Sequence, residues 1–147
     1  EEPLCAEDLF PTITGLAGIK PRNRMHGENL VPVLSGESER LDRPGVMLEF
    51  VRESRPCASF YEKPWRGFVS RDFKYTVWGP EGNLEPWQFF DLRNDQYELK
   101  NLVRDPAFEG VIRQHHKWLC ERMKETGDDE GLAPAWGLPA FQPWVIK

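Results

Sequence analysis

No stretch of this sequence approaches the roughly 18 consecutive apolar residues that a membrane-spanning helix needs. The first residues, Glu1-Glu2-Pro3, also lack the basic and apolar regions of a secretory signal. Blocks of like charge are missing as well, since 24 acidic and 19 basic residues are interspersed and give a net charge of -5. We therefore expect a soluble chain that spans no membrane and binds no nucleic acid, because nucleic-acid binders present a basic face.

Cysteine is scarce, and the cysteines that occur form no known pattern. Cys5, Cys57 and Cys120 are odd in number, and their spacing fits neither a zinc site nor a disulfide framework. We interpret them as small, buried or half-buried thiols. At 147 residues the chain is nevertheless long enough to bury a core without disulfides.

The N-terminal third predicts one short helix, residues 8–17, with Asp8 as its N-cap and Gly18 as its end. The apolar residues of this helix fall on one face and are Leu9, Ile13, Leu16 and Ala17. The remainder of the first 45 residues is polar or punctuated by proline and glycine. We expect exposed connections there, apart from one helical turn at residues 30–34.

The middle of the chain predicts strands. Residues 46–51 are nearly all apolar, which predicts a strand covered on both faces. Glu49 within them is either a buried functional carboxylate or a strand-end residue that pairs with an arginine. Residues 66–70 and 73–78 predict a hairpin, and residues 87–92 a third strand, so that these three strands form an antiparallel meander.

Residues 87–103 are the most informative segment: an aromatic strand, an acidic turn and the approach to a helix. Asp105 is a good N-cap, Pro106 suits the first helical position, and Gly127 supplies the end. Apolar residues follow helical spacing in between, namely Phe108, Val111, Ile112, Trp118, Leu119 and Met123. The pattern predicts an α+β fold in which a small antiparallel sheet is packed by a long C-terminal helix.

These elements, in this order, resemble the C-terminal part of the sulfatases, within the alkaline-phosphatase superfamily. The matching segments are Asp8 to Ile19 with Pro21, Gly27 to Gly36, Val46 to Phe50, Trp65 to Tyr75, and Phe89 to Leu102. The last one resembles the family phrase Leu-Tyr/Phe-Asp-Leu-x-x-Asp-Pro-x-Glu-x-x-Asn-Leu, with Gln96 where proline is usual. Several ordered segments are far more specific than a single motif, and together they cover residues 8–125.

The resemblance implies three parts. Residues 1–52 would be the end of the sulfatase α/β catalytic domain, to which the short helix and the first strand belong. Residues 53–127 would be a C-terminal subdomain of antiparallel sheet and helix. Residues 128–147 form an apolar tail whose prolines exclude a helix, and we expect it to lie along a surface of this domain or of a partner.

The resemblance also implies that the chemistry lies elsewhere. Sulfatases use a formylglycine made from Cys or Ser in a Cys/Ser-x-Pro-x-Arg motif, and a divalent cation, usually calcium, held by Asp and Asn. None of the three cysteines here begins that motif. The nucleophile, the calcium and all catalytic residues would belong to an N-terminal portion, which would be the partner of this chain together with a sulfate ester substrate. This chain alone would bind no metal and have no activity.

Substrate contacts are expected in the loop of residues 52–66, because loops at strand ends often carry recognition. Sulfate esters are anionic, so cations suit them, and aromatic rings could stack on a sugar or aryl ring. The candidates for substrate binding are Arg52, Tyr61, Lys63, Trp65 and Arg66. A solvated or packing role is the competing interpretation for each of these residues, and it is favoured in the hairpin, where Arg66, Arg71 and Lys74 are expected to pair with the acidic turn around Asp91 and Asp95.

Two other features suggest metal binding and are interpreted otherwise. His115 and His116 are adjacent on the predicted helix and point about 100° apart, so they cannot readily serve one ion. We expect one half-buried and one exposed histidine. The acidic run 128–130 lacks the ligand alternation of a calcium loop and is expected to be a solvated helix end.

Two further functions fit the sequence. The chain could be a stand-alone binding or interaction module for a sulfated glycan or a protein partner. Alternatively, it could be the C-terminal region of a phosphodiesterase or a phosphonate hydrolase of the same superfamily. The nucleophile and the metal ligands that would separate these enzymes from a sulfatase are not in this sequence.

Overall fold

The computed structural model describes residues 2–50, 65–78 and 85–128. The chain divides into two compact units, residues 1–46 and residues 47–147. None of the helices in the described ranges combines the length and the apolar character needed to cross a bilayer.

The unit of residues 1–46 contains short helical segments. They are η1 (Ala6–Asp8), α1 (Leu9–Leu16) and α2 (Val31–Leu34). Gly18 follows α1 with a φ of 67°, a left-handed conformation that glycine adopts without steric cost. The helix predicted at 8–17 and the turn predicted at 30–34 are therefore confirmed.

The interior of this unit contains an ion pair. The carboxylate of Asp8, only 1% exposed, accepts hydrogen bonds from both terminal nitrogens of Arg43 at 2.6 and 2.7 Å. It also accepts from the backbone N–H groups of Cys5 and Glu28, each at 2.9 Å. Burial alone would raise the pKa of Asp8, but these hydrogen bonds outweigh it and hold the pKa well below its usual range. The Asp8 side chain makes no capping hydrogen bond to α1, so this prediction is wrong. Its two oxygens instead bind the guanidinium of Arg43 and two backbone N–H groups outside the helix.

The unit of residues 47–147 is built on an antiparallel sheet. Its strands are β1 (Gly45–Phe50, which begins before the division between the units), β2 (Trp65–Ser70), β3 (Phe73–Trp78) and β4 (Glu85–Asp91), side by side in that order. β2 pairs with β3, and β3 with β4, both antiparallel. The predicted hairpin and the predicted strand after it are confirmed.

β1 differs from its prediction. The sequence predicted a meander of three strands and a separate strand covered on both faces. Instead, β1 lies beside β2 as a fourth strand at the edge of the described sheet, and Val46 is its only buried residue. An apolar run therefore does not require burial on both faces, because a strand at a sheet edge can leave much of its side-chain surface only partly covered.

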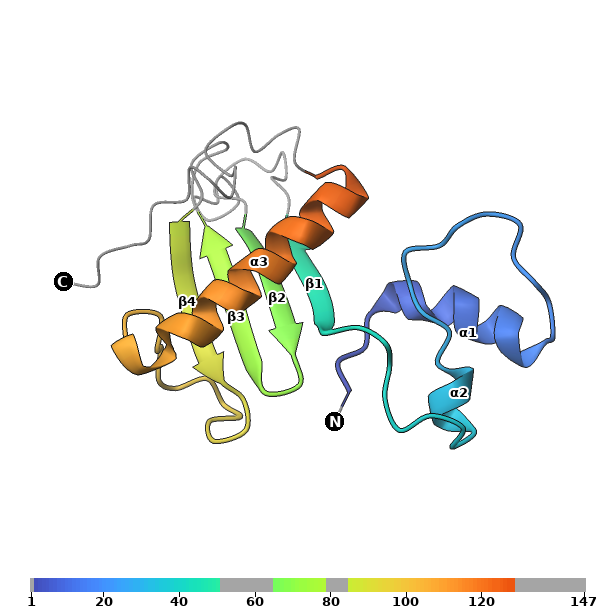
Figure 1. Cartoon of the computed structure of the whole chain (residues 1–147), viewed down its shortest axis with the longest axis horizontal. Coiled ribbons are helices and arrows are strands. Elements are labelled where there is room, and N and C mark those ends of the chain that lie inside the picture. The colour runs from blue at the N-terminus through green and yellow to red at the C-terminus, as the bar shows by residue number, and fades with distance from the viewer. Residues whose placement is uncertain (1, 51–64, 79–84, 129–147) are drawn as a thin grey trace, which may run out of the picture. The chain divides into compact units, whose positions relative to one another are not determined.

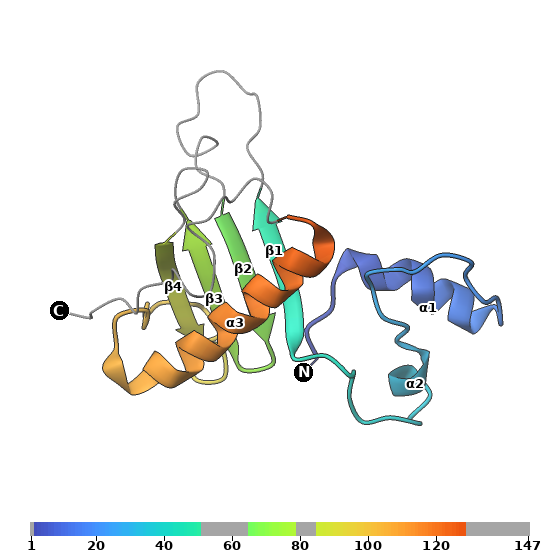
Figure 2. The same cartoon turned by 45° about the horizontal axis from the view of Figure 1, so that its top comes forward.

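The long helix begins and ends where the sequence predicts. Asp105 accepts a hydrogen bond from the backbone N–H of Ala107 at 3.0 Å and opens η3 (Pro106–Phe108), which leads into α3 (Glu109–Thr126). Gly127, with a φ of 73°, ends α3. Figures 1 and 2 show α3 running diagonally across one face of the sheet, which is the predicted α+β arrangement.

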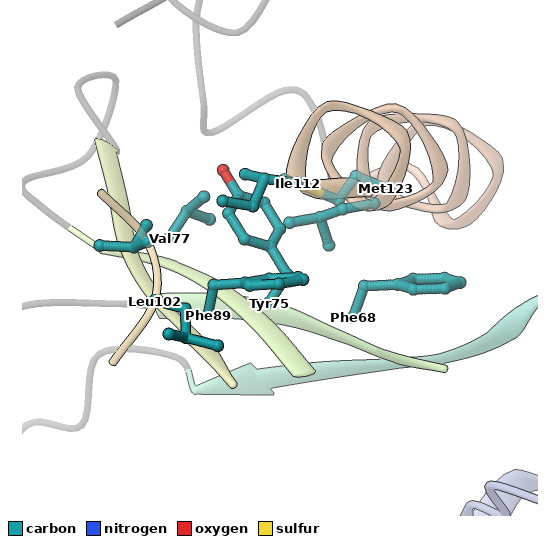
Figure 3. Packing of buried hydrophobic residues seen from close by; sticks show 9 residues of the cluster. Phe68, Tyr75, Val77, Phe89, Leu102, Ile112 and Met123 are labelled. Carbon is teal, nitrogen blue, oxygen red and sulfur yellow. The ribbon is translucent and has the colours of Figure 1, made fainter. Parts of the chain in front are cut away.

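The core lies between α3 and this face of the sheet (Figure 3). Its buried side chains are Phe68, Tyr75, Val77 and Phe89 from the strands, Leu102 and Val103 from the segment after β4, and Ile112, Leu119 and Met123 from α3. Full burial of one such side chain stabilises a fold by about 1.5–3 kcal/mol. The unit of residues 47–147 therefore has a core of its own.

The acidic turn after β4 is held by its own carboxylates. Asp91 accepts from the backbone N–H groups of the residues two and three positions later, at 3.1 Å each, and Asp95 accepts from the N–H of Lys100 at 2.8 Å. Lys74 of β3 pairs with Glu98, which has a positive φ of 57°. Lys74 therefore binds this turn, but through Glu98, because Asp91 and Asp95 already satisfy backbone donors.

Candidate functional site

Two of the predicted substrate-binding residues, Trp65 and Arg66, lie in the described structure, at the start of β2. Arg52, Tyr61 and Lys63 lie outside the described residues. The structure therefore places the base of the candidate loop, where the chain leaves β1 and enters β2.

Arg66 is buried, with 6% of its surface exposed, and its guanidinium is bound by protein groups. Nε and Nη2 donate to the two carboxylate oxygens of Asp128 at 2.5 and 2.8 Å. Nη1 donates to the carbonyl oxygens of Phe50 and Trp65, each at 3.1 Å. Bidentate pairs of this kind are among the strongest polar contacts in proteins. An anionic substrate would have to displace Asp128 in order to bind this guanidinium.

The surroundings of Arg66 answer two questions left open by the sequence. Glu49 has 56% of its side chain exposed and lies 4.0 Å from the guanidinium of Arg66. It is therefore the strand-end residue beside an arginine, and the alternative of a buried carboxylate is wrong. Asp128, predicted as part of a solvated helix end, is instead an ion-pair partner from 62 positions along the chain. No local pattern could have revealed this pair.

Aromatic rings cross the same end of the sheet. Trp65 stacks on Phe50, with ring centroids 6.3 Å apart and planes 8° apart. Trp65 is also the cross-strand partner of Trp78, which stacks on Trp87 with centroids 5.1 Å apart. We call Phe50, Trp65, Trp78 and Trp87 the aromatic row. Trp65 was predicted as a candidate from the sequence, but the row was not, although all its members adjoin the ends of predicted strands.

The aromatic row lies on the sheet face that α3 does not cover. Successive side chains of a strand point to opposite faces. Because Val77 belongs to the core under α3, the next residue, Trp78, points the other way, and its cross-strand partner Trp65 shares that face. β4 carries a bulge, since Val77 lies opposite Pro86 and Thr76 opposite Gln88, which leaves Trp87 as the extra residue. Bulges redirect side chains in this way.

Both histidines of α3 are buried, so the prediction of one exposed histidine is wrong. His115 has Nδ1 2.8 Å from the carbonyl oxygen of Val111 and Nε2 2.9 Å from Oγ of Ser70. His116 has Nδ1 3.1 Å from Oη of Tyr75. Burial lowers the pKa of both, that of His116 to about 4. α3 crosses a sheet of several strands. The sheet therefore covers a part of the helix surface wide enough to bury both histidine rings.

The described cysteines are held as thiols. Cys5 and Cys120 are half-buried and free, as predicted, and Cys57 lies outside the described residues. Burial raises the pKa of Cys120 to about 11, and its Sγ lies 3.4 Å from Nε2 of His116. Burial and the neighbouring Asp8 raise the pKa of Cys5. Because the thiolate is the nucleophile, neither position is set up for nucleophilic attack at neutral pH.

Calcium, which the resemblance implies for an intact enzyme, does not fit the described residues. No three His, Cys, Asp or Glu side chains within residues 2–50, 65–78 and 85–128 come close enough together to hold a metal ion. Asp128 of the acidic run has its carboxylate on Arg66. We therefore assign no described residue to a metal.

A second surface, in the unit of residues 1–46, is apolar and uncovered. The side chains of Leu9, Phe10, Ile13 and Leu16 on α1 are 60–67% exposed. We call these four residues the apolar face of α1. The buried side chains of this unit include the polar Asp8 and Thr12. A domain that folds by itself usually buries its large apolar side chains, whereas this unit exposes them. A contiguous exposed apolar patch of this kind marks a contact surface.

Comparisons with known proteins point to one family. The family model described as N-sulphoglucosamine sulphohydrolase, C-terminal, matches residues 2–125. A Delta 4,5-hexuronate-2-O-sulfatase of Bacteroides thetaiotaomicron is 32% identical over 122 residues, which are 83% of this chain and 24% of that relative.

Solved structures agree with this match. The structure of a 2-O GAG sulfatase is similar with a TM-score of 0.70 and 31% identity, over 84% of this chain and 25% of that one. The phosphonate monoester hydrolase of Agrobacterium radiobacter is similar with a TM-score of 0.62 and 25% identity, over 80% of this chain and 24% of that one. The chain thus spans about a quarter of the length of the proteins it matches.

Proposed function

The chain belongs to the sulfatase family, in which it corresponds to the C-terminal region, and we propose that it completes the fold of a sulfuric ester hydrolase. The formylglycine nucleophile and the calcium would lie in the N-terminal portion of the same polypeptide. The role of this chain is to support that catalytic portion and to lend it a loop at the substrate pocket.

The observation that carries this proposal is the apolar face of α1. Four large apolar side chains, each about three-fifths exposed, stand on a unit whose interior holds an ion pair. Water contact with this much apolar surface is unfavourable, so the face needs a cover. The relatives are about four times as long as this chain, and we propose that their N-terminal portion has a counterpart here that supplies the cover.

The hydrogen bonds of Arg66 to the two ends of the loop that follows β1 support a role for that loop. Phe50 and Trp65 flank the segment of residues 51–64, and Arg66 binds the carbonyl oxygens of both. We propose that Arg66 positions the two ends of this segment, while Arg52, Tyr61, Lys63 and Trp65 remain the predicted substrate contacts. Arg66 itself would then act on the substrate through the loop and not by direct contact.

The substrate class is proposed from the relatives. One is a hexuronate-2-O-sulfatase and another a 2-O GAG sulfatase, so a sulfated carbohydrate is the substrate that we propose for the intact enzyme. The similarity to a phosphonate monoester hydrolase makes hydrolysis of a phosphonate monoester the second candidate reaction. The C-terminal region alone does not separate the two reactions, because it does not carry the groups that attack sulfur or phosphorus. A stand-alone binding module is disfavoured by the uncovered face of α1.

The test compares this chain with the complete polypeptide. Both are assayed for sulfate release from an aryl sulfate and from a 2-O-sulfated uronic acid disaccharide, and for hydrolysis of a phosphonate monoester. We expect sulfate release by the complete polypeptide only, and restoration of activity when this chain is co-expressed with the N-terminal portion. A complete reading frame without the Cys/Ser-x-Pro-x-Arg motif, together with binding of a sulfated sugar by a monomeric form of this chain, would contradict the proposal.

A further inference from the structure

An exposed loop in the unit of residues 1–46 carries three cations that lack carboxylate partners among the described residues. Lys20, Arg22 and Arg24 are all exposed, and none of them forms an ion pair within the described ranges. We call residues 19–27 the basic loop. The sequence holds no acidic residue between Asp8 and Glu28. The basic loop is therefore a local positive surface on a chain whose net charge is -5.

The other cations of the described structure are placed differently. Every other lysine and arginine in residues 2–50, 65–78 and 85–128 pairs with a carboxylate or has an acidic residue within two positions along the chain. Arg113, for example, pairs with Glu109 on α3, and Arg104 directly precedes Asp105. Opposite charges at close spacing largely cancel each other's field, whereas grouped cations raise the local concentration of an anionic ligand. The basic loop is the exception to the mixed charge of this surface.

Buried polar groups hold the base of the basic loop. Directly after it, the backbone N–H of Glu28 donates to Oδ1 of Asp8 at 2.9 Å, and that of Leu30 donates to Oγ1 of Thr12 at 3.0 Å. Asp8 and Thr12 are only 1% and 7% exposed. Figures 1 and 2 show the loop leaving the end of α1 and running back along the helix toward its start. The buried hydrogen bonds of this unit thus fix the base of a loop whose cations stay in solvent.

The chemistry of the basic loop suits a polymer with repeated anionic groups. Arginine binds a sulfate or a carboxylate through parallel N–H bonds, and lysine binds it as a point charge. A single exposed ion pair contributes little, so a small anion on one of these cations would be held weakly. A carbohydrate with an anionic group on successive sugars can meet several cations at once, and linked contacts of this kind reinforce one another.

We propose that the basic loop binds the sulfated carbohydrate at sugars other than the one whose sulfate ester is cleaved. Lys20, Arg22 and Arg24 are its contacts with the anionic groups of these sugars. The substrate of the intact enzyme is then an oligosaccharide or a polymer and not a single sugar. This inference rests on the proposed function, which supplies a sulfated carbohydrate as the substrate, and it adds a site outside the loop of residues 52–66.

A binding measurement tests the loop without requiring turnover. The complete polypeptide is titrated with a fluorescein-labelled heparin octasaccharide, and the basic-loop variant combines Lys20→Gln, Arg22→Gln and Arg24→Gln. We expect this variant to raise Kd about tenfold, because three exposed contacts each contribute modestly, and to weaken the dependence of Kd on salt. The control variant removes the same charge from exposed positions of the other unit and should leave Kd unchanged. Its substitutions are Arg104→Gln, Lys117→Gln and Lys124→Gln.

Three results of this measurement would overturn the proposal. The first is an equal Kd in the basic-loop variant and the parent protein, or an equal loss of affinity in the control variant. The second is tighter binding of a single-stranded oligonucleotide of the same charge, which would make the loop a nucleic-acid site. The third is a loss of stability to urea that the control variant does not show, since it would assign the three cations to contact with the N-terminal portion.

Kinetics separate this inference from the proposed function. Sulfate release is measured with a 2-O-sulfated uronic acid disaccharide and with an octasaccharide that ends in the same sugar. We expect the basic-loop variant to raise the ratio of the octasaccharide KM to the disaccharide KM about tenfold, because only the longer substrate reaches the loop. If the parent protein releases sulfate and this ratio is the same in the variant, the inference fails and the proposed function stands. If the parent protein releases no sulfate from either substrate, the proposed function fails, and the octasaccharide Kd decides about the loop.

Discussion

The substitution Leu16→Ser tests whether the apolar face of α1 is a contact surface. Leu16 is 67% exposed in this structure. Full burial of a leucine is worth about 1.5–3 kcal/mol, so covering the exposed two-thirds would contribute about 1–2 kcal/mol. A serine hydroxyl buried there without a partner costs about 1–3 kcal/mol more. In the complete polypeptide, Leu16→Ser should therefore lower the free energy of unfolding by about 2–5 kcal/mol.

The same substitution should be almost silent in this chain by itself. An exposed side chain loses no burial energy, so only the lower helix propensity of serine remains, a cost of about 0.5 kcal/mol or less. Urea denaturation followed by tryptophan fluorescence measures the stability of both proteins, and the rate of heat unfolding of the complete polypeptide gives a second estimate where unfolding is irreversible. The expected signature is a cost that arises only when the N-terminal portion is present.

Leu99→Ser is the matched control. It makes the same chemical change at a residue that is 84% exposed on the turn after β4, which belongs to the other unit. It should cost little in either protein. If Leu16→Ser also costs less than about 0.5 kcal/mol in the complete polypeptide, or costs the same in both proteins, the apolar face of α1 is not covered by the N-terminal portion and the reasoning fails.

Three further predictions concern an ion pair, a buried histidine and two glycines. The substitution Arg66→Met leaves Asp128 without its ion-pair partner and should lower the free energy of unfolding, measured by urea denaturation, by about 3 kcal/mol. The double variant with Asp128→Ala should cost clearly less than the sum of the two single variants. Strict additivity would show that the pair is not coupled. Burial holds the pKa of His116 at about 4 against 6.5 for an unburied ring, so the folded state prefers the neutral ring, and its contribution is complete above pH 6.5 and is lost as the pH falls toward 4. Urea denaturation at several pH values should show a loss of up to about 3 kcal/mol over this range, and His116→Gln should flatten the profile if His116 is its source. A methyl group added at Gly27 would lie 2.0 Å from the carbonyl oxygen of Glu7, whereas one at Gly110 meets nothing within 4 Å. Gly27→Ala should therefore disrupt the unit of residues 1–46, seen as faster proteolysis there, while Gly110→Ala should stabilise α3 by about 0.5–1 kcal/mol; the opposite order would contradict the packing around Gly27.

Local signals predicted most of the secondary structure because each acts within a few residues. Asp105, Pro106 and Gly127 mark the ends of the η3–α3 helix, and the carboxylates of Asp91 and Asp95 close the turn after β4 on their own backbone. Their physical basis is the hydrogen bonding of nearby N–H groups and the steric freedom of glycine, which need no tertiary context.

The candidate site was less predictable because its contacts join distant positions. Arg66 was a reasonable candidate for an anionic substrate on chemistry alone, yet the structure gives its guanidinium to Asp128, 62 positions away. His115 and His116 were predicted to be one half-buried and one exposed ring because of their angular separation, but the sheet under α3 is wide enough to bury both. Trp65 was identified, whereas its neighbours Trp78 and Trp87 join it through strand register and a bulge.

The sequence by itself determined the order and type of the elements, the α+β class and the membership of the sulfatase family, because periodicity, caps and ordered motifs are all written within short stretches. Only the tertiary structure decided that β1 joins the sheet, that Asp8 pairs with Arg43 in the interior of the first unit, and that the aromatic row spans four strands. These features depend on which distant residues meet. A side chain's partner follows from the packing of whole elements and not from its neighbours in sequence, so the same arginine or histidine can bind a ligand or hold the fold together.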